Sequence, residues 1–213
     1  MARDLTYIHR YEPGADPTLP PILLLHGTGG DETDLIPLGR AIAPGAALLS
    51  PRGNVLEGDR PRFFRRFGEG LFDEDDVRRR ADQLAAFIAE ARQTYGLDQP
   101  VALGYSNGAN IAAAVLLLHP EALAGAILFR AMAPLADLPR SGLSGVPVLI
   151  LSGLNDPIAP RSSGGKLAAA LAAAGARVER DDLPAGHGLT LDDVERAKAF
   201  YAREAAQSFR PGP

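Results

Sequence analysis

Short apolar runs alternate with longer amphipathic stretches along most of the chain. Such runs are typical of buried strands, and such stretches are typical of helices that bury one face. The runs predict strands at residues 22–26, 46–50, 101–104, 125–130, 147–153 and 176–182. The stretches predict helices at 31–43, with an interruption near Pro37, and at 73–95, 108–118, 163–174 and 191–209. This alternation predicts an α/β fold with a mostly parallel twisted sheet and helices on both faces, with residues 5–10 as an antiparallel edge strand.

Length, charge and cysteine content limit the class of protein. A chain of 213 residues suits one domain, so we expect residues 1–213 to form a single α/β unit. A net charge of −4 argues against a dedicated nucleic-acid binder, and the absence of cysteine excludes disulfides and thiol nucleophiles. The longest apolar run, 111–118, is too short to span a bilayer, and we find no secretory signal. We therefore expect a cytoplasmic protein without membrane insertion.

The run Gly104-Tyr105-Ser106-Asn107-Gly108 matches the pattern G-x-S-x-G. It lies between a predicted strand and a predicted helix, which is the context that a nucleophile elbow requires. The sharp turn strains the backbone of the serine, so its neighbours at 104 and 108 must carry little or no side chain. We therefore predict that Ser106 is a nucleophile.

A serine hydroxyl needs a base and a carboxylate that orients the base. Two histidines follow Ser106 in the chain. His119 ends the same predicted helix, roughly 20 Å from Ser106, which is too far for a base. His187 lies in a loop between Gly186 and Gly188, after the last predicted strand, and is the predicted base.

The acid is expected after a strand and between the serine and the histidine in chain order. Asp156 is the first carboxylate after the predicted strand 147–153, and Pro157 follows it. Asp137, Asp181 and Asp182 are the rivals, but they precede that strand or lie close to the predicted base. We therefore favour Asp156 over a role for this residue in the turn alone.

An oxyanion hole needs two backbone N–H groups. Asn107, directly after the nucleophile, is the first predicted donor. Thr28 is the second, because it lies among glycines in His26-Gly27-Thr28-Gly29-Gly30, after the strand 22–26. This loop contains neither G-x-G-x-x-G nor G-K-[ST], so a nucleotide site is not expected.

In their order and spacing, four motifs resemble the phospholipase/carboxylesterase family of α/β hydrolases. The motifs are residues 25–30, 104–108, 156–160 and 186–188. The runs His-Gly-Thr-Gly-Gly-Asp-Glu and Gly-Tyr-Ser-Asn-Gly-Ala-Asn are similar to the bacterial carboxylesterase subgroup linked to hydroquinone resistance.

The better-known members of the family carry His-Gly-Leu-Gly-Asp and Gly-Phe-Ser-Gln-Gly, from which this chain departs at Thr28, Gly30 and Asn107. The resemblance implies hydrolase chemistry, but these departures argue against a long-chain acyl-thioester or lysophospholipid substrate. The family includes homodimers, so a homodimer is compatible with the resemblance.

Residues 51–72 form an additional segment that the predicted strands and helices do not include. The chain is too short to contain a large cap domain as well. Because four of the eight phenylalanines lie here, we expect an ordered loop over the active site. Phe63, Phe64 and Phe67 are expected to form an apolar wall for the substrate or, alternatively, to pin the loop to the core. Arg52 or Arg65 is expected at the rim of the site.

Arg130 and Met132 are weak candidates for the substrate pocket. The cluster Arg60, Arg62, Arg65 and Arg66 is interpreted as a solvated face in preference to an anion site. Arg130 and Met132 follow the strand 125–130 at the carboxyl edge of the sheet, where open α/β folds bind ligands.

Together these features predict a serine carboxylesterase that hydrolyses short-chain or aryl carboxylic esters through an acyl-enzyme. Its partner is a small-molecule ester, and the chemistry needs no metal and no organic cofactor. An acyl-thioesterase, a lysophospholipase or an acyltransferase with the same triad stays open. A non-catalytic binder of quinone-like ligands is less favoured, because all three triad candidates are present.

Overall fold

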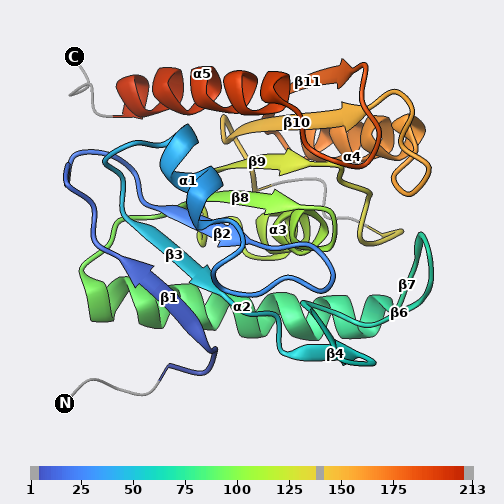
Figure 1. Cartoon of the computed structure of the whole chain (residues 1–213), viewed down its shortest axis with the longest axis horizontal. Coiled ribbons are helices and arrows are strands. Elements are labelled where there is room, and N and C mark those ends of the chain that lie inside the picture. The colour runs from blue at the N-terminus through green and yellow to red at the C-terminus, as the bar shows by residue number, and fades with distance from the viewer. Residues whose placement is uncertain (1–4, 138–141, 209–213) are drawn as a thin grey trace.

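The computed structural model describes residues 5–137 and 142–208, which form a seven-stranded sheet between helices (Figure 1). The strands are β1 (His9–Glu12), β2 (Ile22–Leu25), β3 (Leu48–Pro51), β8 (Val101–Tyr105), β9 (Gly125–Phe129), β10 (Pro147–Gly153) and β11 (Arg177–Leu183). Their order in the sheet is β1-β3-β2-β8-β9-β10-β11. Only the edge strand β1 is antiparallel to its neighbour among the described strands of this sheet.

Helices cover both faces of this sheet. They are α1 (Ile36–Ile42), α2 (Glu74–Tyr95), α3 (Asn107–Leu118), α4 (Arg161–Ala173) and α5 (Leu191–Ser208). Successive side chains of a strand point to opposite faces. In β2, Leu23 and Leu25 therefore join the core with α2, α3 and α4, while Ile22 and Leu24 join the core with α1 and α5. This two-sided burial confirms the predicted α/β fold class.

Two elements differ from the sequence prediction at their ends. The first helix is not interrupted at Pro37 but begins at Ile36, with the proline in its first turn. Proline is tolerated there because its missing N–H has no intrahelical partner in any case. The edge strand starts at His9 and not at residue 5, because Tyr7 is buried against Phe87 before the strand begins.

Residues 52–72, here called the hairpin arm, include two small antiparallel hairpins outside the main sheet, whereas Pro51 belongs to β3. The first pairs β4 (Val55–Glu57) with β5 (Arg60–Arg62), and the second pairs β6 (Arg66–Gly68) with β7 (Leu71–Phe72). No larger cap is present in the described ranges. In the described part of the chain, none of the helices combines the length and the apolar character that crossing a membrane requires.

The first turn of α3 lies directly against the ends of β2 and β8. A Cβ atom on Gly108 would lie 2.0 Å from the carbonyl oxygen of Leu25, and one on Gly104 would lie 2.7 Å from the Cα atom of Ala109. Both glycines are therefore required by the close approach of two backbones, which no small side-chain shift can relieve.

We expect Gly108→Ala to lower the free energy of unfolding by about 1–3 kcal/mol or more, because the new methyl group overlaps main-chain atoms. Urea denaturation measures the change. Gly68→Ala is the matched control, since a Cβ atom at Gly68 meets nothing within 4 Å. An unfolding midpoint of Gly108→Ala equal to that of the control would contradict this packing.

Candidate active site

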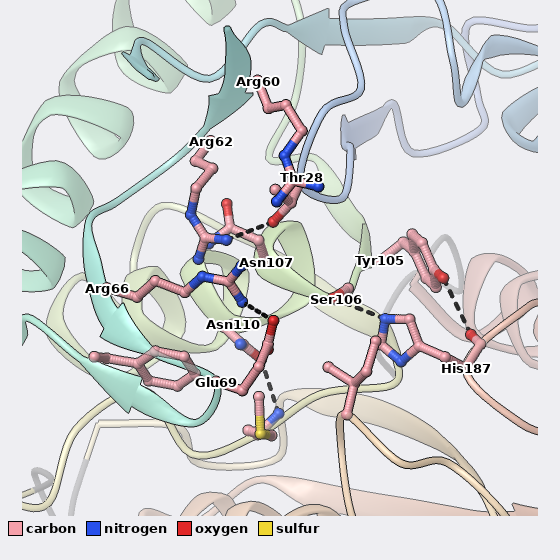
Figure 2. A pocket seen from close by; sticks show the side chains of 13 residues that line it. Thr28, Arg60, Arg62, Arg66, Glu69, Tyr105, Ser106, Asn107, Asn110 and His187 are labelled. Carbon is pink, nitrogen blue, oxygen red and sulfur yellow. Dashed lines mark hydrogen bonds and ion pairs between the residues drawn. The ribbon is translucent and has the colours of Figure 1, made fainter. Parts of the chain in front are cut away.

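Three side chains from the carboxyl edge of the sheet form a continuous hydrogen-bonded chain. Ser106 follows β8, Asp156 follows β10, and His187 follows β11. The Nε2 atom of His187 lies 3.1 Å from the Oγ atom of Ser106, and its Nδ1 atom lies 2.8 Å from Oδ2 of Asp156. Figure 2 shows the imidazole of His187 directed at Ser106. The structure thus brings together residues that lie 81 and 31 positions apart in the chain.

Ser106 has the backbone geometry of a strained turn. Its φ of 52° and ψ of −114° lie in a region that residues other than glycine rarely adopt. Its N–H donates to the carbonyl of Phe129 at 2.9 Å, which ties the turn to β9. Helix α3 begins at the next residue, Asn107, so the hydroxyl lies at the positive end of that helix.

Asp156 is oriented by its own turn. Its Oδ1 atom accepts the N–H groups of Ile158 and Ala159 at 2.8 and 3.0 Å, which leaves Oδ2 for His187. The side chain of Asp156 is fully buried, so its geometry is fixed by the protein and not by solvent.

The rival candidates for the acid and the base have other environments. Asp181 pairs with Arg196, Asp182 pairs with Arg180, Asp137 is exposed, and His119 pairs with Asp82 at the surface. Among the described residues, none of these rivals has a hydrogen bond to Ser106.

The loop that carries His187 is held by Arg130. Its guanidinium donates to the carbonyls of Gly186 and Gly188, both at 2.9 Å, on either side of His187. The same guanidinium forms a bidentate ion pair with Asp193, with both distances 2.7 Å, and both side chains are inaccessible to solvent. Arg130 also has a positive φ of 55°. It is therefore a buried positioning residue, and its prediction as a pocket residue is wrong.

The ion pair also affects the titration of Asp193. Burial raises the pKa of Asp193, but hydrogen bonds from Arg130 and Thr190 outweigh this effect and hold the pKa below its usual range. Asp193 is therefore ionised at neutral pH and compensates the charge of Arg130.

The loop after β2 supplies a free backbone donor. The N–H groups of Gly29 and Gly30 are used by the carbonyls of Pro61 and Gly27. The N–H of Thr28 has no acceptor among the described residues, and neither has that of Asn107, which is the first N–H of α3. Both residues line the cavity beside Ser106.

His26 fixes this loop. Its Nδ1 atom donates to the carbonyl of Gly27 at 2.7 Å, and its Nε2 atom accepts the N–H of Gly53 at 2.9 Å. Burial lowers the pKa of His26, which keeps the ring neutral so that Nε2 stays an acceptor.

A cavity of about 200 Å³ opens above Ser106. Its wall consists of residues from the sheet edge and from the hairpin arm. The lining residues are Thr28, Arg60, Arg62, Arg66, Glu69, Phe72, Tyr105, Ser106, Asn107, Asn110, Met132, Ile158 and His187. Met132 was predicted at this position from the sequence.

The predicted aromatic wall is wrong. Phe63 and Phe64 are buried in the core, Phe63 against His26 and Phe64 edge-on to Phe72, so these rings pin the arm to the core. Phe67 is 68% exposed and does not line the cavity.

The predicted arginine rim also needs correction. Arg52 pairs with Glu32 and Arg65 pairs with Asp73, and neither lines the cavity. The interpretation of the arginine cluster as a solvated face holds for Arg60 and Arg65, which are exposed, but is wrong for Arg62 and Arg66, which are 3% and 15% exposed. Arg60, Arg62 and Arg66 line the cavity. The sequence contains a signal for this shared orientation. Arg60 and Arg62 are two residues apart, and residues two apart on a strand lie on the same face.

Residues 20–143 match the family model described as alpha/beta hydrolase fold. MhqD of Bacillus subtilis strain 168, named as a hydrolase, is 43% identical over 91% of this chain and 96% of its own length.

Two solved structures of carboxylesterases are similar over nearly the whole chain. The enzyme from Bacillus cereus is 44% identical, with a TM-score of 0.91, over 94% of this chain and 95% of its own. The enzyme from Mesorhizobium loti is 34% identical, with a TM-score of 0.88, over 93% of this chain and 96% of its own. These matches confirm the resemblance inferred from the motifs.

We expect Asp193→Asn to lower the free energy of unfolding by about 3–5 kcal/mol, because it leaves Arg130 buried without a counter-charge. The rate of ester hydrolysis should fall as well, since the His187 loop loses its support. Urea denaturation and p-nitrophenyl acetate hydrolysis measure the two effects. The stability difference should shrink below pH about 4, where Asp193 of the unfolded wild type becomes protonated.

Asp192→Asn is the matched control, because Asp192 is exposed on the same turn of α5. Equal stability of the two variants at pH 7 would contradict a role for the Arg130–Asp193 pair.

Proposed function

The chain belongs to the α/β-hydrolase fold family and is similar to carboxylesterases, and we propose from this premise that it is a serine carboxylesterase for short-chain or aryl esters. One observation carries the proposal. The hydrogen-bonded chain from Ser106 through His187 to Asp156 has the distances that nucleophilic catalysis by serine requires.

In the first half of the proposed reaction, the Oγ atom of Ser106 attacks the carbonyl carbon of the ester. Nε2 of His187 takes the hydroxyl proton, and the carbonyl electron pair moves to the oxygen of a tetrahedral intermediate. Asp156 holds the imidazole in the orientation seen here and stabilises its charged form. When the intermediate collapses, the ester C–O bond breaks, and His187 gives its proton to the leaving alcohol.

In the second half, water repeats these steps on the acyl-enzyme. His187 takes a proton from the water, the hydroxide adds to the acyl carbon, and collapse returns the proton to Ser106 and releases the carboxylic acid. The ester, water and the three side chains account for all atoms and protons.

The N–H groups of Thr28 and Asn107 are proposed to bind the oxyanion. Both are without an acceptor among the described residues, and both line the cavity. The Asn107 donor lies at the N-terminus of a 12-residue helix, whose dipole favours negative charge at that point.

The size of the cavity supports small substrates. Its volume of about 200 Å³ lies below the roughly 300–1,000 Å³ of pockets for larger ligands. Phe72, Met132 and Ile158 provide its apolar lining, which suits a short acyl chain or an aromatic ring.

We expect Ser106→Ala and His187→Ala each to reduce kcat/KM for p-nitrophenyl acetate by about a thousandfold or more. Circular dichroism checks that the variants are folded. His119→Ala is the control, because this histidine pairs with Asp82 at the surface, and its activity should equal that of the wild type. Folded Ser106→Ala with wild-type activity would refute the serine mechanism.

We also expect p-nitrophenyl acetate and butyrate to be hydrolysed faster than longer esters, because the cavity is small. A series of p-nitrophenyl esters of increasing chain length measures the preference. A preference for acyl chains of about twelve carbons or more would contradict the proposed substrate class.

A further inference from the structure

Three arginines of the hairpin arm line the cavity that contains Ser106. Arg60 and Arg62 lie on one face of β5, and Arg66 begins β6. Figure 2 shows their guanidinium groups on the side of Ser106 opposite His187. These three residues are here called the arginine face. They come from a segment outside the main sheet, so the fold itself does not require positive charge at this place.

The arginine face carries more positive charge than its protein partners neutralise. Glu57 is shared by all three arginines, at 3.1 Å from Arg62, 3.0 Å from Arg66 and 3.8 Å from Arg60. Glu69 contacts Arg66 at 2.5 Å. Asp156, the other carboxylate close to the site, is engaged by His187. Three cations therefore face two carboxylates, of which only Glu69 lines the cavity.

Arg62 is the most buried member. Its side chain is 3% exposed, pairs with Glu57 at 3.1 Å and donates to the carbonyl of Phe64 and to Oγ1 of Thr28, but its Nη2 group has no hydrogen-bond acceptor among the described residues. Burial and the neighbouring charge of Arg66 lower the pKa of Arg62 to about 10, so it stays protonated at neutral pH. A buried cation in this state favours a further anionic partner.

The amide group of Asn107 also lacks a hydrogen-bond acceptor. Its Oδ1 atom accepts the N–H of Phe63, but its buried Nδ2 group has no hydrogen-bond partner among the described residues. Buried donors are normally satisfied, so an unsatisfied one that lines a cavity beside cations indicates a missing acceptor.

A purely structural role explains part of this cluster only. The contact of Arg66 with Glu57 joins the two hairpins of the arm, and its contact with Glu69 lies within the second hairpin. They do not explain Arg60, which is 53% exposed with its nearest carboxylate at 3.8 Å, or the free Nη2 group of Arg62.

We infer that the arginine face binds a free carboxylate on the substrate, so that the preferred substrates are small half-esters with one ester group and one carboxylate. This inference rests on the proposed esterase function. The planar guanidinium fork matches a carboxylate, and the volume of about 200 Å³ admits only a short spacer between the two groups.

The test compares monoethyl succinate with its neutral isostere, ethyl 4-methylpentanoate, by titration of the acid released at constant pH. We expect kcat/KM for the half-ester to exceed that for the isostere by about tenfold or more, and the ratio to fall as sodium chloride is added. Arg60→Gln combined with Arg66→Gln should lower this ratio by about tenfold or more. Arg62 is left intact, because it also supports Thr28.

Two further variants are measured in the same assay, one as a matched control and one that should raise the ratio. Arg65→Gln is the matched control, since Arg65 belongs to the same arm but pairs with Asp73 outside the cavity, and its ratio should equal that of the wild type. Glu69→Gln should raise the ratio, because it removes the carboxylate that competes for Arg66.

Failure of this inference is distinguishable from failure of the esterase proposal. Hydrolysis of both esters with equal kcat/KM would overturn the carboxylate site and leave the esterase intact. If neither ester is hydrolysed, calorimetric titration of Ser106→Ala with monoethyl succinate decides: binding that the Arg60→Gln and Arg66→Gln substitutions weaken supports the site, and the absence of binding overturns it.

Discussion

The contact between the first turn of α3 and the ends of β2 and β8 is the constraint on which the rest of the site depends. Because Gly108 lies against the carbonyl of Leu25, the chain must turn sharply at Ser106, in a backbone conformation that costs about 1–3 kcal/mol. Burial of nearly every residue of α3 offsets that cost. The same turn projects the hydroxyl above the sheet and leaves the N–H of Asn107 without an intrahelical partner. One packing contact thereby determines the position of the proposed nucleophile and of a proposed oxyanion donor.

A second strained residue lies at the end of the neighbouring strand β9. Arg130 has a positive φ, and its side chain connects the end of β10, the His187 loop and the start of α5. A buried ion pair is weak evidence for stability, since desolvation cancels much of the Coulomb attraction. The Arg130–Asp193 pair contributes to the geometry of the site, because five hydrogen bonds from one rigid guanidinium fix the position of the His187 loop. The site therefore combines a strained residue, the proposed nucleophile Ser106, with a proposed base, His187, whose loop is held by hydrogen bonds from Arg130.

The sequence predicted the features that follow from local pattern and chain order. The strand at 147–153 matches β10, and the helix predicted at 73–95 matches α2, with Asp73 as its N-cap. The three side chains of the proposed triad were found because each follows a strand end. The Arg130–Asp193 pair was not found, since 63 residues separate its members and no periodicity reports a side-chain partner across that distance. The burial of Phe63 and Phe64 depends on a hairpin packing onto His26 and Phe72, which composition alone does not specify.

The proposed reaction and the proposed selectivity have separate structural origins in this protein. The groups proposed to break the ester bond belong to the sheet edge, and the core on both faces of the sheet fixes them. The arginine face belongs to the hairpin arm, which the rings of Phe63 and Phe64 fasten to that core. Hydrogen bonds join the two parts: the guanidinium of Arg62 donates to Thr28 in the loop after β2, and the N–H of Phe63 donates to Asn107. Since a carboxylate bound by the arginines would neutralise their field at the oxyanion, we expect the arm to act chiefly on substrate binding and the sheet edge to determine the chemical step.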